Sequence, residues 1–377
     1  MIINPSIDSS SKPCFLIQIS IAILLVIVFC SSCFSASNLA PPQGPPLGNN
    51  VLACYANGQA FAVSTDRPGA RSGFPRDKRG ALGTPAISPD RRSIAYVSYR
   101  LLTYDNDLES TSPADGEIWV MGSHGESPHK IRNLLSPSPR YSLASSVWID
   151  WTPDGKKLVC LECVRKQFNL YAMDMYGNIT AKTSWEISSQ SEPECSLAVS
   201  QDGTRVAYLV NTHEGGNGFY LEKEHCRIAL RTLSPNGFGP ERVLIDKYGP
   251  AQDQGALFSF GISWLSAHEV VIAESQGQSS NERHVPTASV VCKVNTETKH
   301  IDPVFNTTDG YFYMLGPTIS PNHQDLSFVS HKSVPLTGNE VDRIVTVDLS
   351  NRSQTTVIPN LNLLEYNLPY CVNWSSP

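Results

Sequence analysis

The sequence has few charged residues and no excess of positive charge. Only 17% of its 377 residues are Asp, Glu, Lys or Arg, below the roughly 25% of an average soluble chain. The 29 Lys and Arg residues against 35 Asp and Glu leave a net charge of −6. A nucleic-acid-binding protein needs a concentrated positive surface to neutralise phosphates, so the composition argues against that class of partner. The 41% hydrophobic content also excludes a chain that is disordered throughout.

The motifs of common catalytic, nucleotide and metal sites are missing as well. There is no Gly-x-Ser-x-Gly, no P-loop and no Gly-x-Gly-x-x-Gly after a strand, and the His-Glu pairs at 213–214 and 268–269 lack a second His. Cys160 and Cys163 form a Cys-x-x-Cys, but on an alternating strand these thiols point to opposite faces. The acidic segment 105–109 lacks the glycine and terminal glutamate of an EF-hand loop. We therefore predict no metal and no cofactor, and we favour a non-enzymatic role while leaving an enzyme open.

Long apolar runs are scarce, and the main one lies near the N-terminus. Residues 15–29 read FLIQISIAILLVIVF, follow Lys12 and precede CSSCFSAS, which is the layout of an export signal. The CSSC stretch resembles a bacterial lipobox, with Cys30 where Leu is usual, and this predicts lipidation of Cys33. An uncleaved membrane anchor, somewhat short of the roughly 20 residues of a spanning helix, and a secreted protein are the alternatives. All three place the remainder outside the cytoplasm, and we expect it to be membrane-anchored in the periplasm or at the cell surface.

The sequence predicts three parts. Residues 1–33 are the export signal or membrane anchor, and residues 34–50 are a tether rich in Pro, Gly and Asn without periodicity. Residues 51–377 form one domain built from repeats. No window outside the export segment has a helical period of comparable length.

The repeat combines an apolar strand, a Ser/Thr-Pro-Asp/Asn turn, an alternating strand and a third strand with its own polar turn. The copies are AISPDRRSIAYVS, DWTPDGKKLVCLE, AVSQDGTRVAYLV, the degenerate ISWLSAHEVVIAE, and TISPNHQDLSFVS, at 86–98, 150–162, 198–210, 262–274 and 318–330. Ser followed by Pro, Asp and Gly suits a type I turn whose side chains cap nearby backbone N–H groups. Third strands such as EIWVMGSHGE and NLYAMDMYGN complete each copy. Four short antiparallel strands repeated around an axis make a β-propeller.

These motifs resemble the WD40-like (PD40) repeat of the TolB-type propellers over about residues 50–377. The resemblance implies an all-β propeller with four-stranded antiparallel blades. Members of that type carry an α/β domain before the propeller, whereas only a tether is expected here, so we do not expect TolB itself. The propellers of dipeptidyl-peptidase-type enzymes are also similar, but we expect no hydrolase domain after the repeats.

Counting copies predicts six blades. Five complete copies occupy roughly 85–359, and YCVNWSS near the C-terminus stops where its blade should continue. The segment 51–65 offers two strands with no blade of their own, so we expect N- and C-terminal strands to share the closing blade. Five blades with loose ends, or seven, are the alternatives.

Seven cysteines lie in the repeat region, so at least one is unpaired. Cys54 and Cys371 both fall in the closing blade, and a disulfide there would clamp the ring. Cys195 and Cys226 flank the third copy and are a second possible pair. The alternative is that these cysteines are small buried strand residues.

Loop lengths give the main functional indication. The turns after the first and third strands of each copy are short, whereas the loops between the second and third strands (the B–C loops) are long, at 99–116, 211–225, 275–287 and 331–340. Long loops on one face of a rigid scaffold are where binding usually resides. The candidate binding residues on them are Tyr104, Asp105, Asp107, His213, Phe219, Tyr220, Arg283 and His284.

The sequence therefore predicts a monomeric, extracytoplasmic, membrane-tethered propeller that binds a protein partner on the long-loop face as a scaffold. The first alternative is a carbohydrate-binding or lyase-like propeller that uses a pocket at its axis. The second is a non-catalytic remnant of a propeller–peptidase. His, Glu and Arg side chains clustered in the axial pocket would favour an enzyme, and an apolar or plugged axis would favour the scaffold.

Overall fold

The computed structural model describes residues 43, 45, 46, 48, 51–56, 59–65, 71–73, 82–102, 112–135, 147–164, 167–186, 194–214, 223–250, 257–280, 283–306, 313–333, 340–361 and 371–374. The predicted export segment and Cys33 lie outside these residues. Within them, no helix is long and apolar enough to cross a membrane. The described secondary structure consists of β-strands, numbered β1 to β25 along the chain.

The Ser/Thr-x-Asp/Asn turns fold as the sequence predicts. In the first complete copy the Ser88 hydroxyl donates to the Asp90 carboxylate at 2.6 Å and accepts the Ser93 backbone N–H at 2.9 Å. The Asp90 carboxylate accepts the Arg92 backbone N–H at 3.1 Å. The same bonds recur around Thr152, Ser200 and Ser320. Each short turn thus satisfies its own polar groups and joins two strands tightly.

Five antiparallel sheets are built from consecutive strands, and together they make an all-β propeller with four-stranded blades. The first contains β4 (Leu82–Ile87), β5 (Ser93–Leu102), β6 (Ser112–Gly122) and β7 (His129–Asn133). The second contains β8 (Val147–Trp151), β9 (Lys157–Val164), β10 (Gln167–Asp174) and β11 (Ile179–Glu186). The third contains β12 (Glu194–Val199), β13 (Arg205–Glu214), β14 (Lys223–Ser234), β15 (Gly237–Phe238) and β16 (Arg242–Pro250). The fourth contains β17 (Leu257–Ser266), β18 (Glu269–Ser280), β19 (Arg283–Asn295) and β20 (Ile301–Asn306). The fifth contains β21 (Tyr313–Ile319), β22 (Asp325–Ser333), β23 (Glu340–Asp348) and β24 (Gln354–Leu361).

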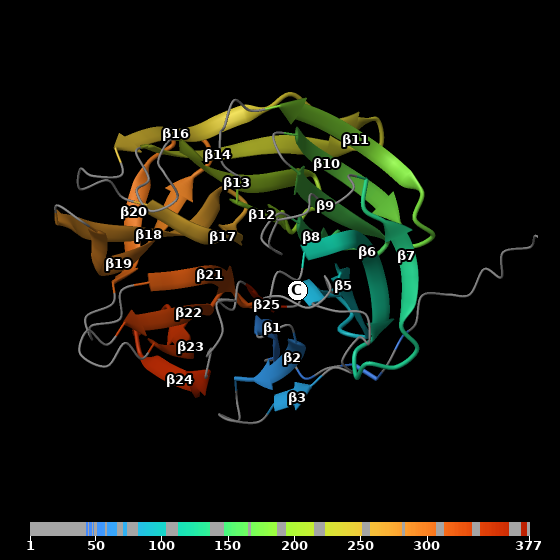
Figure 1. The fold of residues 1–377 in the computed structure, drawn as a ribbon, viewed down its shortest axis with the longest axis horizontal. Coiled ribbons are helices and arrows are strands. Elements are labelled where there is room, and N and C mark those ends of the chain that lie inside the picture. The colour runs from blue at the N-terminus through green and yellow to red at the C-terminus, as the bar shows by residue number, and fades with distance from the viewer. Residues whose placement is uncertain are drawn as a thin grey trace, which may run out of the picture. The chain divides into compact units, whose positions relative to one another are not determined.

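A further sheet contains strands from both ends of the propeller region. Its order is β25 (Cys371–Trp374), β1 (Val51–Ala56), β2 (Gln59–Ser64) and β3 (Arg71–Gly73). The innermost strands contact one another in the order β4, β8, β12, β17 and β21, and β25 contacts both β21 and β4 (Figure 1). The sheets are therefore arranged around a central axis, with β7, β11, β16, β20, β24 and β3 outermost.

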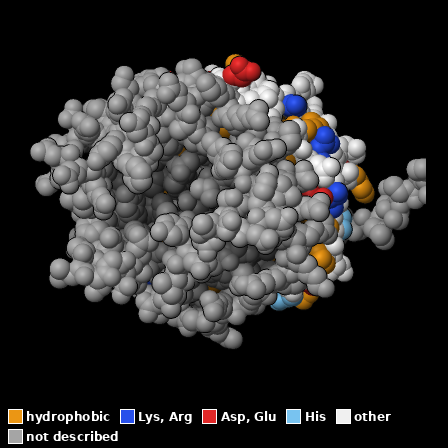
Figure 2. Space-filling model, in the orientation of Figure 1, with side chains coloured by type: hydrophobic (Ala, Val, Ile, Leu, Met, Phe, Trp, Pro, Cys, Tyr) orange, Lys and Arg blue, Asp and Glu red, His pale blue; other side chains and the backbone are white. Residues whose placement is uncertain are grey.

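The hydrophobic core lies between neighbouring sheets, so each sheet is buried on both faces. One cluster packs β8–β11 side chains, including Phe168 and Leu170, against Tyr208 of the next sheet. Cys160 belongs to the cluster on the opposite side of its own sheet from Cys163. The prediction that these two thiols point to opposite faces is confirmed. Burial on two faces also explains the low charge content of the sheets, and Figure 2 shows Lys and Arg side chains at the surface near β7 and β11.

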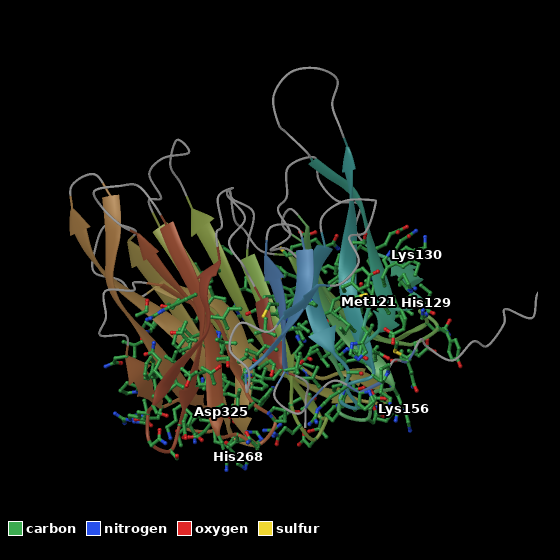
Figure 3. All side chains as sticks on the ribbon, turned by 90° about the horizontal axis from the view of Figure 1, so that it is seen from below. Met121, His129, Lys130, Lys156, His268 and Asp325 are labelled. Carbon is green, nitrogen blue, oxygen red and sulfur yellow. The ribbon has the colours of Figure 1, made fainter. Side chains whose placement is uncertain are left out.

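In the third and fourth sheets the two middle strands are longer than the strands that flank them. Strands β18 and β19 have 12 and 13 residues against 10 and 6 for β17 and β20, and β13 and β14 have 10 and 12 against 6 and 9 for β12 and β16. The predicted loop 275–287 is therefore largely strand, because pairing continues to Ser280 opposite Arg283. The short turns lie at the other end of the propeller, and Figure 3 shows Lys156, His268 and Asp325 toward this lower end, with Lys156 apart from the other two.

The segment predicted as a free tether contacts the short-turn end. The Ser123 hydroxyl donates a hydrogen bond to the Pro45 carbonyl. Gln43 lies with Ser88 and Asp154 around a cavity between the turns of the two neighbouring sheets. Gln43 and Pro45 thus contact the short-turn end of the propeller, and the assignment of residues 34–50 as a tether stays a prediction.

Candidate functional site

A cavity of about 60 Å³ opens at the axis on the short-turn end. Its walls come from the innermost strands β8, β12, β17, β21 and β25 and from two short turns. The lining residues are Trp148, Asp150, Leu197, Ala198, Val199, Gln201, Gly261, Ile262, Ser263, Trp264, Gly316, Pro317, Thr318, Ile319, Ser320, His323 and Trp374. A buried water needs about 10–15 Å³ of such space, so the cavity has room for about four to six waters or a group of that size.

Three side-chain oxygens at equivalent repeat positions line this cavity and join neighbouring sheets. The Asp150 carboxylate accepts the Val199 backbone N–H at 2.8 Å. The Ser263 hydroxyl accepts the Ile319 N–H at 3.2 Å. The Thr318 hydroxyl accepts the Trp374 N–H at 3.5 Å. Each bond crosses from one innermost strand to the next, so these residues have a structural role at the axis.

In the two sheets where the equivalent residue is alanine (Ala86 and Ala198), the indole of a tryptophan on the next sheet makes the connection instead. The Trp151 Nε1–H donates to the Ala86 carbonyl at 2.9 Å, and the Trp264 Nε1–H donates to the Ala198 carbonyl at 3.1 Å. Both rings are buried, at 2% and 5% exposure. Alanine leaves the space that the indole fills, and its carbonyl supplies the acceptor.

Trp374 is the third tryptophan of this series and differs from the other two. Its ring is 3% exposed and lines the cavity, yet its buried indole N–H has no hydrogen-bond partner. The position equivalent to Ala86 and Ala198 is Thr318, whose hydroxyl instead accepts the Trp374 backbone N–H. A buried donor left without an acceptor costs about 1–3 kcal/mol, so this N–H requires an explanation.

Asp150 is the acidic side chain in the wall. Burial raises its pKa to about 7, while the hydrogen bonds from the Val199 and Trp151 backbone N–H groups lower it. Each carboxylate oxygen accepts one of these bonds and keeps a lone pair for a further donor. His323 is the other titratable group that lines the cavity.

Gln201 and His323 meet at the short-turn end of the cavity. The Gln201 amide contacts His323 Nε2, although the two turns belong to the β12–β13 and β21–β22 connections, with the β17–β18 connection between them. His323 occupies the left-handed turn position (φ 59°) that Gly155 and Gly203 fill elsewhere. This turn position therefore carries an imidazole that lines the cavity, whereas it is glycine in two other copies and Arg91 (φ 62°) in the first.

The predicted binding residues are only partly placed. Tyr104, Asp105, Asp107, Phe219 and Tyr220 lie outside the described residues. His213 is in β13 opposite Glu224, and Arg283 and His284 begin β19 opposite Ser280 and Ser279. The last three thus lie in strands of the middle hairpins and not in the loops predicted for them, and their role in binding stays a prediction. Within the described part of the chain, no three His, Cys, Asp or Glu residues gather as a metal site would require.

The two predicted disulfide pairs are not brought into register. Cys195 lies on β12 opposite Val210, and Cys226 lies on β14 opposite Asn211 of the intervening β13. Two strand spacings of about 4.8 Å exceed the usual 4.4–6.8 Å between disulfide-bonded Cα atoms. Cys195 and Cys226 also pack into different core clusters.

The register also separates the second pair. Cys371 is opposite Tyr55, while Cys54 is opposite Val372. The two cysteine positions are therefore offset by one residue in the pairing of β1 with β25. The Cys54 thiol instead lies 3.9 Å from the Leu52 carbonyl.

The axial residues were not identified from the sequence, although a signal was present. Alignment of the repeats puts Ala86, Asp150, Ala198, Ser263 and Thr318 at one position. A carboxylate where two other copies have alanine, on an otherwise apolar innermost strand, marks a departure from the repeat.

No family model matches this sequence, and no curated protein does. Among solved structures, the chain is similar to a protein assigned as a TolB from Agrobacterium tumefaciens (11% identity, TM-score 0.46, covering 85% of this chain and 96% of that one). It is also similar to the periplasmic gluconolactonase PpgL of Pseudomonas aeruginosa (10%, TM-score 0.48, 86% and 98%) and to an oligogalacturonate lyase in complex with manganese (10%, TM-score 0.44, 84% and 74%). At these values the likenesses carry no argument about activity, and the propeller rests on the strand pairing described above.

Proposed function

We propose that the protein is an extracytoplasmic, membrane-tethered six-bladed propeller that binds a protein partner on its long-loop face. The observation that carries this is the asymmetry of the two ends. One end has short, self-satisfied turns, and the other has hairpins that extend beyond the flanking strands. The closing blade of β25, β1, β2 and β3, the membrane anchor and the non-catalytic role are parts of the same proposal.

The β18–β19 hairpin offers a specific means of binding. Along β18, pairing with β17 stops at Ser275, and along β19, pairing with β20 starts only at Val290. Beyond these points, residues 276–280 and 283–289 continue as a two-stranded ribbon in which each strand is the other's described pairing partner. Such a ribbon presents backbone N–H and C=O groups on its outer edges, and an extended peptide can add to an edge of this kind as a further strand.

The experiment is affinity capture from native membranes after cross-linking, with mass spectrometry of the captured proteins. One variant carries His213→Ala, Arg283→Ala and His284→Ala on the long-loop end. The matched control carries Lys156→Ala and His268→Ala on the short-turn end. We expect the loop-end variant to lose a partner that the control retains. Equal capture by both variants would contradict binding on this face. The mass of the mature N-terminus in the same preparation tests lipidation of Cys33.

The second candidate function is binding of a carbohydrate or another small ligand at the axial cavity. It is favoured by the Asp150 carboxylate, which lines the cavity and keeps a lone pair on each oxygen. Titration of the full-length protein with neutral monosaccharides and their derivatives, followed by ligand-observed nuclear magnetic resonance, tests this candidate without reference to any protein partner.

A further inference from the structure

The chain enters the propeller at its short-turn end. In the sheet of β25, β1, β2 and β3, strand β1 holds the place next to the innermost strand that β5 and β9 hold in the first two sheets. Strands β5 and β9 begin directly after a short turn, and the far end of β1 is joined to β2. Val51 therefore lies at the short-turn end. The contact of Pro45 with Ser123, and the position of Gln43 beside the turns of the first two sheets, agree with this entry point.

The length of chain before these contacts limits how the propeller can face a membrane. From the predicted anchor at Cys33 to Gln43 is a step of ten residues, which spans at most about 35 Å when fully extended. The first sheet is about as tall, because β5 and β6 have 10 and 11 residues and a strand rises about 3.4 Å per residue. A tether leading to the long-loop end would have to run this whole height at full extension. The short-turn end reaches the membrane without that constraint.

Two short turns beside Gln43 carry an excess of positive charge. The β4–β5 turn reads SPDRRS and the β8–β9 turn reads TPDGKK, so each has two basic residues for one aspartate. The turns after β12, β17 and β21 have no such excess of Lys and Arg. Arg92 and Lys156 are exposed, while Asp90 and Asp154 accept hydrogen bonds within their own turns. Clusters of exposed Lys and Arg attract anionic lipid headgroups.

An exposed aromatic side chain lies at the same two sheets. Tyr176 is 60% exposed, and no other large hydrophobic side chain is exposed in the part of the chain that the structure describes. It lies in the β10–β11 turn, which follows Asp174, the register partner of Lys157. This turn also contacts the first sheet, because the Arg132 guanidinium donates to the Gly177 carbonyl at 2.8 Å. Tyrosine is favoured at the membrane–water interface, where its ring is buried and its hydroxyl stays hydrated.

We propose that the turns of the first and second sheets form a surface that docks on anionic phospholipid. This basic turn surface consists of Arg91, Arg92, Lys156, Lys157 and Tyr176. A basic patch strengthens the membrane binding of an anchored protein, because the anchor and the patch act together. Docking at this end points the long-loop end away from the membrane. The proposal rests on the membrane anchor of the proposed function and adds the orientation of the propeller to it.

The orientation is measured by energy transfer from a dye on the protein to headgroup-labelled lipids. The mature protein, purified from membranes, is added to preformed vesicles of phosphatidylcholine mixed with phosphatidylglycerol. One variant is labelled at His124→Cys in the exposed β6–β7 turn, and the other at Gln167→Cys at the exposed start of β10, at the long-loop end. The unsubstituted protein is the labelling blank. Strand β10 with its turn spans about 30 Å, so we expect at least about twofold more transfer from position 124. Equal transfer from the two positions, or more from 167, would overturn the proposal.

Charge reversal tests the basic turn surface directly. Arg92→Glu with Lys156→Glu should reduce the difference in transfer between the two dye positions by about half or more, because the new carboxylates repel anionic headgroups. The matched control, Lys182→Glu with Lys247→Glu, makes the same charge change on exposed side chains of β11 and β16 and should leave the difference unchanged. Tyr176→Ser should give a smaller reduction. Vesicles of phosphatidylcholine alone, or high salt, should act on the unsubstituted protein as the reversal does. Equal effects of the two charge reversals would refute the assignment.

Flotation of the same vesicles separates this proposal from the function on which it rests. Protein that floats with the vesicles but shows equal transfer from both dye positions keeps its anchor and contradicts the docking. Protein that does not float contradicts the anchor and the docking with it. Partner capture is measured with substitutions at the opposite end of the propeller, so a failure of capture leaves the docking result intact.

Discussion

Replacing Trp151 with phenylalanine should destabilise the propeller more than the same replacement at Trp374. Trp151 is 2% exposed and donates to the Ala86 carbonyl at 2.9 Å, whereas the equally buried Trp374 indole has no acceptor. Both substitutions remove the same ring atoms, so their packing losses largely cancel in the comparison. What remains is the hydrogen bond between two innermost strands.

The size of the difference follows from that bond. Losing the Trp151 donor leaves the buried Ala86 carbonyl unsatisfied, which costs about 1–3 kcal/mol. For a propeller spanning residues 51–377, the unfolding entropy is about 0.7 kcal/mol/K, from about 2.1 cal/mol/K per residue. The Trp151→Phe variant should therefore melt about 1.5–4 °C below the Trp374→Phe variant.

The assay is thermal unfolding followed by far-ultraviolet circular dichroism, because tryptophan fluorescence differs among the variants. Trp264→Phe is the second test, since its indole donates to Ala198 at 3.1 Å. It should resemble Trp151→Phe, with a further small loss because the Arg205 guanidinium lies 4.9 Å from the centre of its ring. The reasoning is refuted if Trp374→Phe lowers the melting temperature as much as either of the other two.

Three further predictions concern the axis and the short turns. Burial raises the pKa of Asp150 to about 7 from 3.8, so the folded state holds its proton to higher pH than the unfolded state. This contribution to stability is therefore present below about pH 4 and is lost as pH rises to about 7. In urea unfolding at several pH values, Asp150→Asn should be less destabilising at pH 8 than at pH 5, and an equal cost at both would exclude this titration. Ser320→Ala removes the acceptor of the Asp325 backbone N–H at 2.8 Å and should cost about 1–2 kcal/mol by the same method, with no change at all arguing against the turn as a stabilising unit. Gly203→Ala should cost more than Gly155→Ala in thermal unfolding. Both have positive φ (68° and 66°), but a Cβ at Gly203 would lie 3.2 Å from Pro153, against 3.8 Å from Pro89 for Gly155, and the reverse order would contradict this packing.

The repeat could be found in the sequence because its information is local. A Ser or Thr followed two residues later by Asp or Asn closes its own turn through bonds spanning at most five residues, as Ser88 and Ser320 show. The alternation of the strands likewise depends on neighbouring residues alone. These features therefore predict antiparallel strands from the local sequence alone. The same locality explains the correct prediction that Cys160 and Cys163 point to opposite faces.

The loop boundaries and the disulfide pairs were harder to predict from the sequence, because they depend on strand pairing between residues that are distant along the chain. The polar segment 275–287 reads as a loop, yet cross-strand pairing from Gly277 to Ser280 keeps it in a hairpin. Cys195 and Cys226 lie close to the same repeat copy, but β13 separates them. Proximity along the chain did not reveal which strands are neighbours.

The sequence by itself determined the repeat, the all-β class, the short turns and the low charge of sheets that are buried on both faces. The axial cavity was decided by the tertiary structure alone. Asp150, His323 and Trp374 come from three different sheets, and they line one cavity only because the ring arrangement places their innermost strands around a common axis. Whether an indole N–H finds a carbonyl, as Trp151 does and Trp374 does not, depends on the residue that the neighbouring sheet presents. A local sequence pattern cannot predict whether that acceptor is present.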